Sequence, residues 1–239
     1  MNKPKLFVFG DSWSNNYFSK TNPLLPHVKP FLGSGVVESF VRGYGYSGHW
    51  IDHMSNFFDV YSYGIGAASI DQIILQLGNL RKYEYRDGDR MVIIFSGPDR
   101  FNWVHDNVKY GVTIGGAIFD RDMVETKTLK NQLIKRSVWW ETESIEKDER
   151  NFIEFIPTLF MKWKPVMVTW YRDLNIDVVE YMGKGYPTIA QETKRKYVDR
   201  HLGVFGNFKL FQFISNKLGL DISNYNPIIE EFTINRDLI

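Results

Sequence analysis

Short apolar runs alternate along the chain with longer segments in which apolar residues recur every three or four positions. The first run, residues 6–9, lacks the apolar–polar alternation of half-exposed strands, which is typical of a strand buried on both faces of a parallel sheet. The runs cover residues 6–9, 59–63, 90–95 and 165–170. The helical segments cover residues 50–58, 70–80, about 120–161 and 204–218, the last ending at Gly219. Strands that alternate with helices predict an α/β fold, a three-layer sandwich in which helices cover both faces of a parallel sheet.

The loop after the first run reads Phe9-Gly10-Asp11-Ser12-Trp13-Ser14. Glycine lets the backbone turn sharply, and Ser12 would then lie at the carboxyl edge of the sheet, where open α/β folds bind their ligands. Ser12 is therefore a candidate nucleophile, and we expect Ser14 to tolerate replacement by alanine. Alternatively, Asp11 or Ser12 only caps the next helix.

A second candidate set, Val198-Asp199-Arg200-His201, precedes the last predicted helix. A serine hydroxyl becomes a good nucleophile when an imidazole takes its proton, and the imidazole works best when a carboxylate fixes its tautomer. Ser12, His201 and Asp199 supply these three groups. The alternative is that Asp199 starts the helix and His201 is an ordinary packed or surface imidazole.

Phe9-Gly10-Asp11-Ser12 and the Asp199–His201 pair resemble the first and last blocks of the GDSL or SGNH hydrolase family. The resemblance implies a flavodoxin-like strand order and cleavage of esters or thioesters by Ser12, with His201 as general base and Asp199 as its orienting carboxylate. It also implies a single domain over residues 1–239, with insertions at about 20–48 and 100–163 beside the rim of the active site.

The resemblance further implies an oxyanion hole made of the Ser12 amide, a glycine amide and an asparagine side chain. Gly66 fits the glycine, although Gly64-Ile65-Gly66 can also be a plain turn between strand and helix. Asp99 stands where the family has the asparagine, and an ionised carboxylate would repel an oxyanion. Either Asp99 has another role, such as pairing with Arg100, or Asn102 or Arg100 supplies the third donor, or the hole has two donors.

Composition excludes several classes of protein. Lys and Arg number 29 against 28 Asp and Glu, so the net charge of +1 gives no reason to expect nucleic acid or an acidic membrane as a partner. The absence of cysteine excludes a thiol nucleophile, disulfides and thiolate metal sites. The first apolar run is too short for the core of a signal peptide, and no run approaches the length of a membrane span, so we expect a cytoplasmic or virion-associated protein.

Neither a metal nor an organic cofactor is expected. His49 and His53 would share a helix face as metal ligands do, but no third ligand is evident, and we interpret them as surface or rim residues. Gly64-x-Gly66-x-x-Ser69 is a poor match to a dinucleotide-binding loop because its third glycine is missing.

The polar and aromatic residues of the predicted insertions favour a carbohydrate over a lipid. Tryptophans occur there at positions 103, 139, 140 and 163, where they would either stack on sugar rings or form part of the core. Many members of the family remove acetyl groups from polysaccharides. We therefore predict a serine ester hydrolase that removes acetyl or other short acyl groups from a small-molecule or polysaccharide ester. The alternative is a catalytically weak or inactive carbohydrate-binding or structural protein, for example of a virus particle.

Overall fold

The computed structural model describes residues 3–14, 49–65, 68–95, 100–105, 108–113, 145–169, 176–178, 202 and 204–226. For residues 100–105, 108–113, 145–150, 177–178 and 204–205, only the backbone is described.

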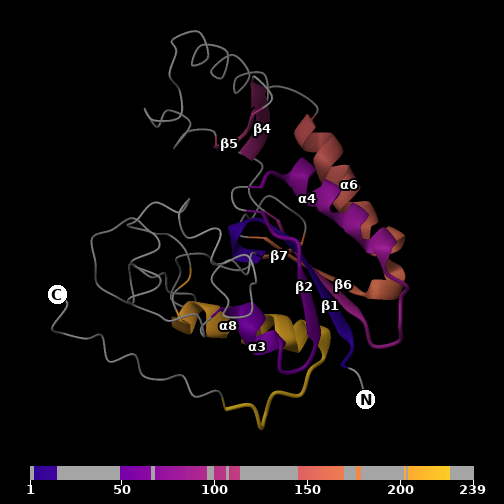
Figure 1. Ribbon diagram of the computed structural model, residues 1–239, viewed down its shortest axis with the longest axis vertical. Coiled ribbons are helices and arrows are strands. Elements are labelled where there is room, and N and C mark those ends of the chain that lie inside the picture. The colour runs from indigo at the N-terminus through magenta and orange to yellow at the C-terminus, as the bar shows by residue number, and fades with distance from the viewer. Residues whose placement is uncertain are drawn as a thin grey trace, which may run out of the picture.

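A five-stranded sheet forms the centre of the described structure (Figure 1), and all its strand pairs are parallel. From one edge to the other, the strands are β2 (Asp59–Ser62), β1 (Lys5–Gly10), β3 (Arg90–Phe95), β6 (Pro165–Thr169) and β7 (Asp177–Val178). Counting only these strands in chain order gives 2-1-3-4-5, which is the flavodoxin-like order. The predicted α/β class, parallel sheet and strand order are confirmed.

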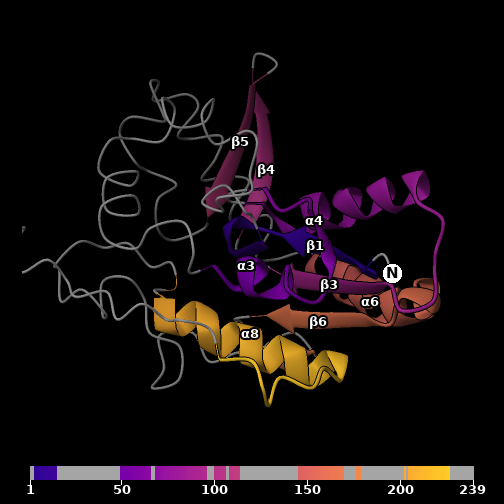
Figure 2. The ribbon, with the colours of Figure 1, turned by 60° about the horizontal axis from the view of Figure 1, so that its bottom comes forward.

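Helices cover both faces of this sheet, with α4 and α8 on opposite sides in Figure 2. One face packs against α3 (Trp50–Met54) and α8 (Val204–Leu218). The other packs against α4 (Ile70–Gln76) and α6 (Ile145–Leu159). Successive residues of β1 point to opposite faces, so Leu6 and Val8 join the first cluster while Phe7 and Phe9 join the second.

The two central strands are the most buried part of the sheet. Every residue from Leu6 to Phe9 and from Met91 to Phe95 has no exposed surface. Burial of a large aliphatic or aromatic side chain stabilises the fold by roughly 1.5–3 kcal/mol. These runs lack alternation because neither of their faces meets water.

Several elements differ from the sequence-based expectation. The first helix ends at Met54, and Phe57 lies in the turn that follows it. The second helix changes at Leu77 into the 3₁₀ helix η2 (Leu77–Lys82). The short strand β7 was not predicted.

Residues 100–163, expected as an insertion, contain an unpredicted antiparallel hairpin of β4 (Arg100–His105) and β5 (Val108–Thr113). The hairpin projects away from the sheet in Figures 1 and 2. In contrast, α6 lies on the sheet, where Ile153 and Ile156 are buried. It lies between β3 and β6 in the chain, as a crossover helix of a parallel sheet does.

Candidate active site

Gly10, the last residue of β1, occupies a position that only glycine can fill. Its φ is +145°, in a region that other residues rarely adopt. A Cβ added there would lie 2.2 Å from Ser14 Oγ and 2.4 Å from the Ile94 carbonyl oxygen. Backbone conformation and close packing therefore both require glycine at the entry to the Ser12 loop.

Asp11 is the residue that caps the turn after β1. Its Oδ1 accepts a hydrogen bond from the Trp13 amide at 3.0 Å, and its carbonyl accepts one from the Ser14 amide at 3.0 Å. These bonds begin the 3₁₀ turn η1 (Ser12–Ser14), and Asp11 is fully buried beneath it. Of the two residues that could cap this turn, Asp11 does so, and Ser12 remains partly accessible to solvent as the first residue of the turn.

Ser14 has a structural role, which argues against our expectation that it tolerates alanine. It is fully buried, and its Oγ donates a hydrogen bond to the Phe9 carbonyl at 2.9 Å. Its own carbonyl accepts a hydrogen bond from Ser62 Oγ on the neighbouring strand β2. Alanine at position 14 would remove this hydrogen bond, at a cost of about 0.5–1.5 kcal/mol.

Trp50 links the Ser12 loop to the segment that starts α8. Its Nε1 donates to the Trp13 carbonyl at 2.7 Å, and its backbone amide donates to Asn207 Oδ1 at 3.3 Å. Asn207 Nδ2 in turn donates to the Leu202 carbonyl at 3.0 Å. Leu202 directly follows His201, and Leu202 and Trp13 belong to the same buried cluster. Trp13 and Leu202, which follow Ser12 and His201 in the chain, are therefore connected to each other through Trp50 and Asn207.

Most of the other predicted site residues lie outside the described residues: Gly66, Asp99, Asp199 and His201. The chain just before Gly66 does reach the Ser12 loop, because the Ile65 amide donates to the Gly10 carbonyl at 3.0 Å. Asn102 lies in β4, opposite Gly111 of β5.

Sequence reasoning missed three residues that shape this region: Trp50, Asn207 and Gln76. Trp50 was interpreted only as an apolar helix position, and Asn207 was not considered. Gln76 offered a usable signal, because it lies three residues after Ile73 and four before Leu80, on the apolar side of its helix. A polar residue on such a face needs a hydrogen-bonding partner when it is buried.

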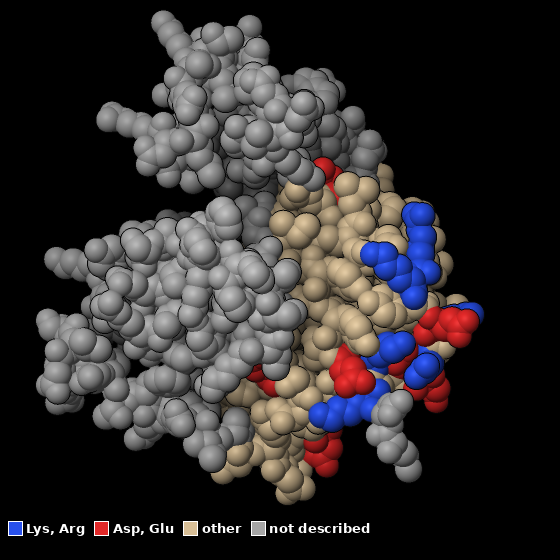
Figure 3. Space-filling view, in the orientation of Figure 1, with Lys and Arg blue, Asp and Glu red and all other residues tan. Residues whose placement is uncertain are grey.

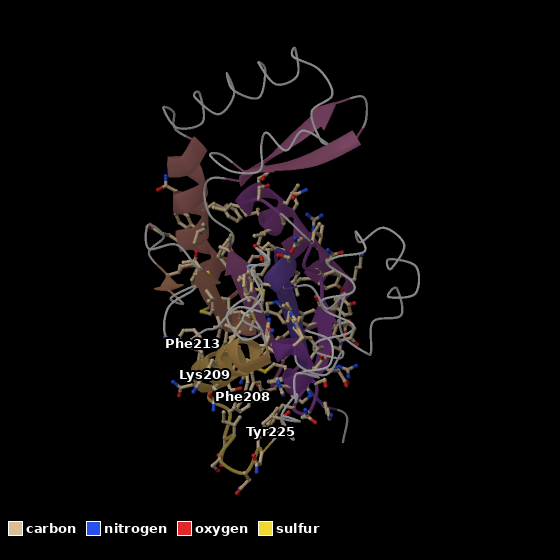
Figure 4. The ribbon with its side chains drawn as sticks, turned by 90° about the vertical axis from the view of Figure 1, so that its left-hand side faces the viewer. Phe208, Lys209, Phe213 and Tyr225 are labelled. Carbon is tan, nitrogen blue, oxygen red and sulfur yellow. The ribbon has the colours of Figure 1, made fainter. Side chains whose placement is uncertain are left out.

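His49 and His53 are buried, so their interpretation as surface or rim residues is wrong. His49 is the N-cap of α3, where its Nδ1 accepts a hydrogen bond from the Ile51 amide at 3.3 Å. His53 packs against Phe208 and Tyr225, and its Nδ1 lies 3.0 Å from the Tyr225 hydroxyl oxygen. Figure 4 shows Phe208 on α8 and Tyr225 in the segment that follows this helix. In the part of the chain that the structure describes, no three His, Asp or Glu residues lie together as metal ligands would.

The buried imidazole of His53 should make the stability of the fold depend on pH. Burial lowers the pKa of His53 from 6.5 to about 4, so the unfolded chain binds a proton there at a pH where the folded chain does not. The contribution of the neutral imidazole to the free energy of unfolding is therefore fully present above pH 6.5 and is lost as the pH falls toward 4. Burial and the nearby Asp52 raise the pKa of Tyr225, which stays protonated throughout this range.

We expect the free energy of unfolding to fall by about 2 kcal/mol between pH 7.5 and pH 5 through His53 alone. Urea unfolding at both pH values checks this, with His53→Gln as the matched variant because glutamine offers Tyr225 a partner but does not titrate. The same pH dependence in both proteins would contradict the assignment.

The structure places two of the four tryptophans of the predicted insertions. Trp163 is buried, with its ring edge-on to Phe7 and Tyr85 at centroid distances of 5.0 and 5.2 Å, so it belongs to the core. Trp103 lies in β4, opposite Tyr110 of β5. Residues 139 and 140 lie outside the described residues.

No protein-family model matches the chain, and no curated protein matches it significantly. Among the described helices, none has the length and apolar character needed to cross a membrane. In Figure 3, positive and negative side chains are interspersed over the described part of the visible face, in keeping with the net charge of +1.

Proposed function

We propose that this protein is a serine ester hydrolase that removes acetyl or other short acyl groups from a carbohydrate. The observation that carries the proposal is the position of Ser12, which is partly exposed just beyond β1 on a turn that requires glycine at position 10. In an open α/β sheet with this strand order, ligands bind beyond the carboxyl ends of the strands. The anchoring of Leu202 and Trp13 through Trp50 supports a place for His201 at the same edge.

In the proposed mechanism, Ser12 attacks the ester carbonyl while His201 takes its proton and then passes it to the leaving alcohol. Asp199 orients His201, and water releases the acyl group in a second step. The amides of Ser12 and Gly66 would stabilise the oxyanion. Asn102 or Arg100 is the candidate third donor, since Asp99 in its ionised form is an acceptor.

The hairpin supports a carbohydrate as the alcohol part of the ester. Trp103 is paired with Tyr110 and Phe101 with Val112, so these four residues share one face of the hairpin. β4 starts five residues after the end of β3, which keeps its base near the carboxyl edge of the sheet. Aromatic residues on one face of a hairpin that starts close to this edge suit a sugar ring. A lipase would instead need an apolar channel for the acyl chain, in which burial contributes about 0.8 kcal/mol per methylene.

A series of chromogenic esters tests this function. Hydrolysis should decrease as the acyl chain grows from two to eight carbons, and acetate should be released from an acetylated polysaccharide. A rate that rises steadily with chain length would overturn the short-acyl assignment. An absence of both ester hydrolysis and labelling by a serine-directed phosphonate would instead favour the alternative, a carbohydrate-binding or structural protein without catalysis.

A further inference from the structure

The side chain of Gln76, the last residue of α4, forms hydrogen bonds with both the backbone amide and the backbone carbonyl of Gly10. The Gly10 amide donates to Gln76 Oε1 at 2.8 Å, and Gln76 Nε2 donates to the Gly10 carbonyl at 2.9 Å. Gln76 is only 5% exposed, so water does not compete effectively for these bonds. One carboxamide thus satisfies a donor and an acceptor of the residue that enters the Ser12 loop.

These two hydrogen bonds take the place of strand pairing beyond the end of β2. On the β2 side of β1, the Val8 carbonyl accepts from the Tyr63 amide at 2.8 Å, and the Gly10 carbonyl accepts from Ile65 at 3.0 Å. β2 itself ends at Ser62, and the Gly10 amide pairs with the Gln76 side chain instead of a strand. The last peptide before the turn is therefore oriented by a side chain from another element.

We propose that Gln76 is a positioning residue that fixes the direction in which the Ser12 loop leaves the sheet. This inference rests on the proposed function. Ser12 follows Gly10 by two residues, so a rotation of the Gly10 peptide moves the serine. Gln76 also joins this turn to α4, the helix that follows Gly66, and thereby couples the segments that carry the two predicted oxyanion amides. A displacement of about 1 Å at a reacting group can cost a hundredfold in rate.

The substitution Gln76→Glu tests this role through protonation. A neutral carboxyl carries one donor and one acceptor, as the carboxamide does, whereas an ionised carboxylate has only acceptors and would face the Gly10 carbonyl. Burial and that carbonyl should raise the pKa of the introduced group. At pH 8 we expect kcat for a chromogenic acetyl ester to be about ten- to a hundredfold below wild type with little change in KM. As the pH is lowered and the introduced carboxyl becomes protonated, the ratio of variant to wild-type kcat should recover. The ratio is used because the titration of His201 affects both proteins and cancels in it.

Gln72→Glu is the matched control, one turn earlier on the same helix. Gln72 Oε1 accepts a hydrogen bond from the Ser69 amide at 3.3 Å, a role that an ionised carboxylate fills equally well. This variant should keep wild-type kcat at every pH. Gln76→Met, which has no strong donor or acceptor, should show a lowered kcat whose ratio to wild type does not change with pH.

Active-site titration with a phosphonate expresses each rate per folded molecule and so separates positioning from stability. If Gln76 is only structural, both Gln76 variants will unfold more easily but keep wild-type kcat per titrated site, which overturns the proposal. Gln76→Met decides between the two roles if Gln76→Glu does not fold at pH 8. An inactive wild type would overturn both the proposed function and the role of Gln76, whereas an active wild type with unaffected variants overturns the role of Gln76 alone.

Discussion

Replacement of Ser12 by alanine should lower esterase turnover by a thousandfold or more while leaving the fold intact. The loss should be large because the proposed nucleophile is removed, and only substrate binding and oxyanion stabilisation would remain. The fold should persist because Ser12 is partly exposed, while Asp11, Ser14 and Gly10 make the contacts that shape the turn. The measurement is kcat for a chromogenic acetyl ester, alongside the thermal unfolding midpoint of each protein.

The control for this substitution must be a serine that the turn does not need. Ser14 is unsuitable because its hydroxyl bonds the Phe9 carbonyl in the core. Ser55 is suitable, since it is exposed just after α3 and its hydroxyl donates to the Asp52 carbonyl in its own turn. Ser55→Ala should retain full activity. Near-normal turnover by purified Ser12→Ala would exclude Ser12 as the nucleophile.

The parts of the fold that the sequence predicts well are those in which local pattern and tertiary environment agree. The predicted run at 90–95 coincides with β3, because Met91–Phe95 are buried on both faces of the sheet and are all apolar. The last helix was predicted to end at Gly219, and α8 ends one residue earlier, with Gly219 at a φ of +71°. Glycine takes this conformation without strain, so it terminates the helix.

The features that the sequence did not predict depend on contacts between distant segments. Gln76 contacts Gly10 across 66 residues, and Trp50 contacts Asn207 across 157, and no local periodicity encodes such pairs. His53 looked like a surface residue because its burial comes from Phe208 and Tyr225, which lie far along the chain.

The hairpin is a different case, because its signal was present in the sequence. Two segments in which apolar residues occupy every second position, at 100–105 and 108–113, are separated by two residues. This arrangement is typical of a β-hairpin. It was missed because the region was interpreted as an insertion into the family pattern.

Replacement of Asp199 by asparagine should slow turnover by at least about a hundredfold and leave substrate affinity nearly unchanged, because asparagine favours the wrong tautomer of His201. Its effect should be smaller than that of His201→Ala, since backbone carbonyls can also orient an imidazole. Loss of the carboxylate also destabilises the imidazolium, which lowers the pKa of His201 and shifts the acidic limb of the pH–rate profile to lower pH.

Asp87→Asn is the matched control for this pair of effects. Asp87 is exposed in the turn before β3, where its Oδ1 accepts a hydrogen bond from the Gly88 amide at 3.0 Å, and an asparagine oxygen accepts this bond equally well. The control should therefore keep both the wild-type rate and the wild-type pH profile. If Asp199→Asn behaves like the control in both respects, Asp199 is not the partner of His201. Slow turnover with an unshifted profile would also exclude a carboxylate–imidazole pair, because removal of a carboxylate that faces the ring should lower the pKa of the imidazole.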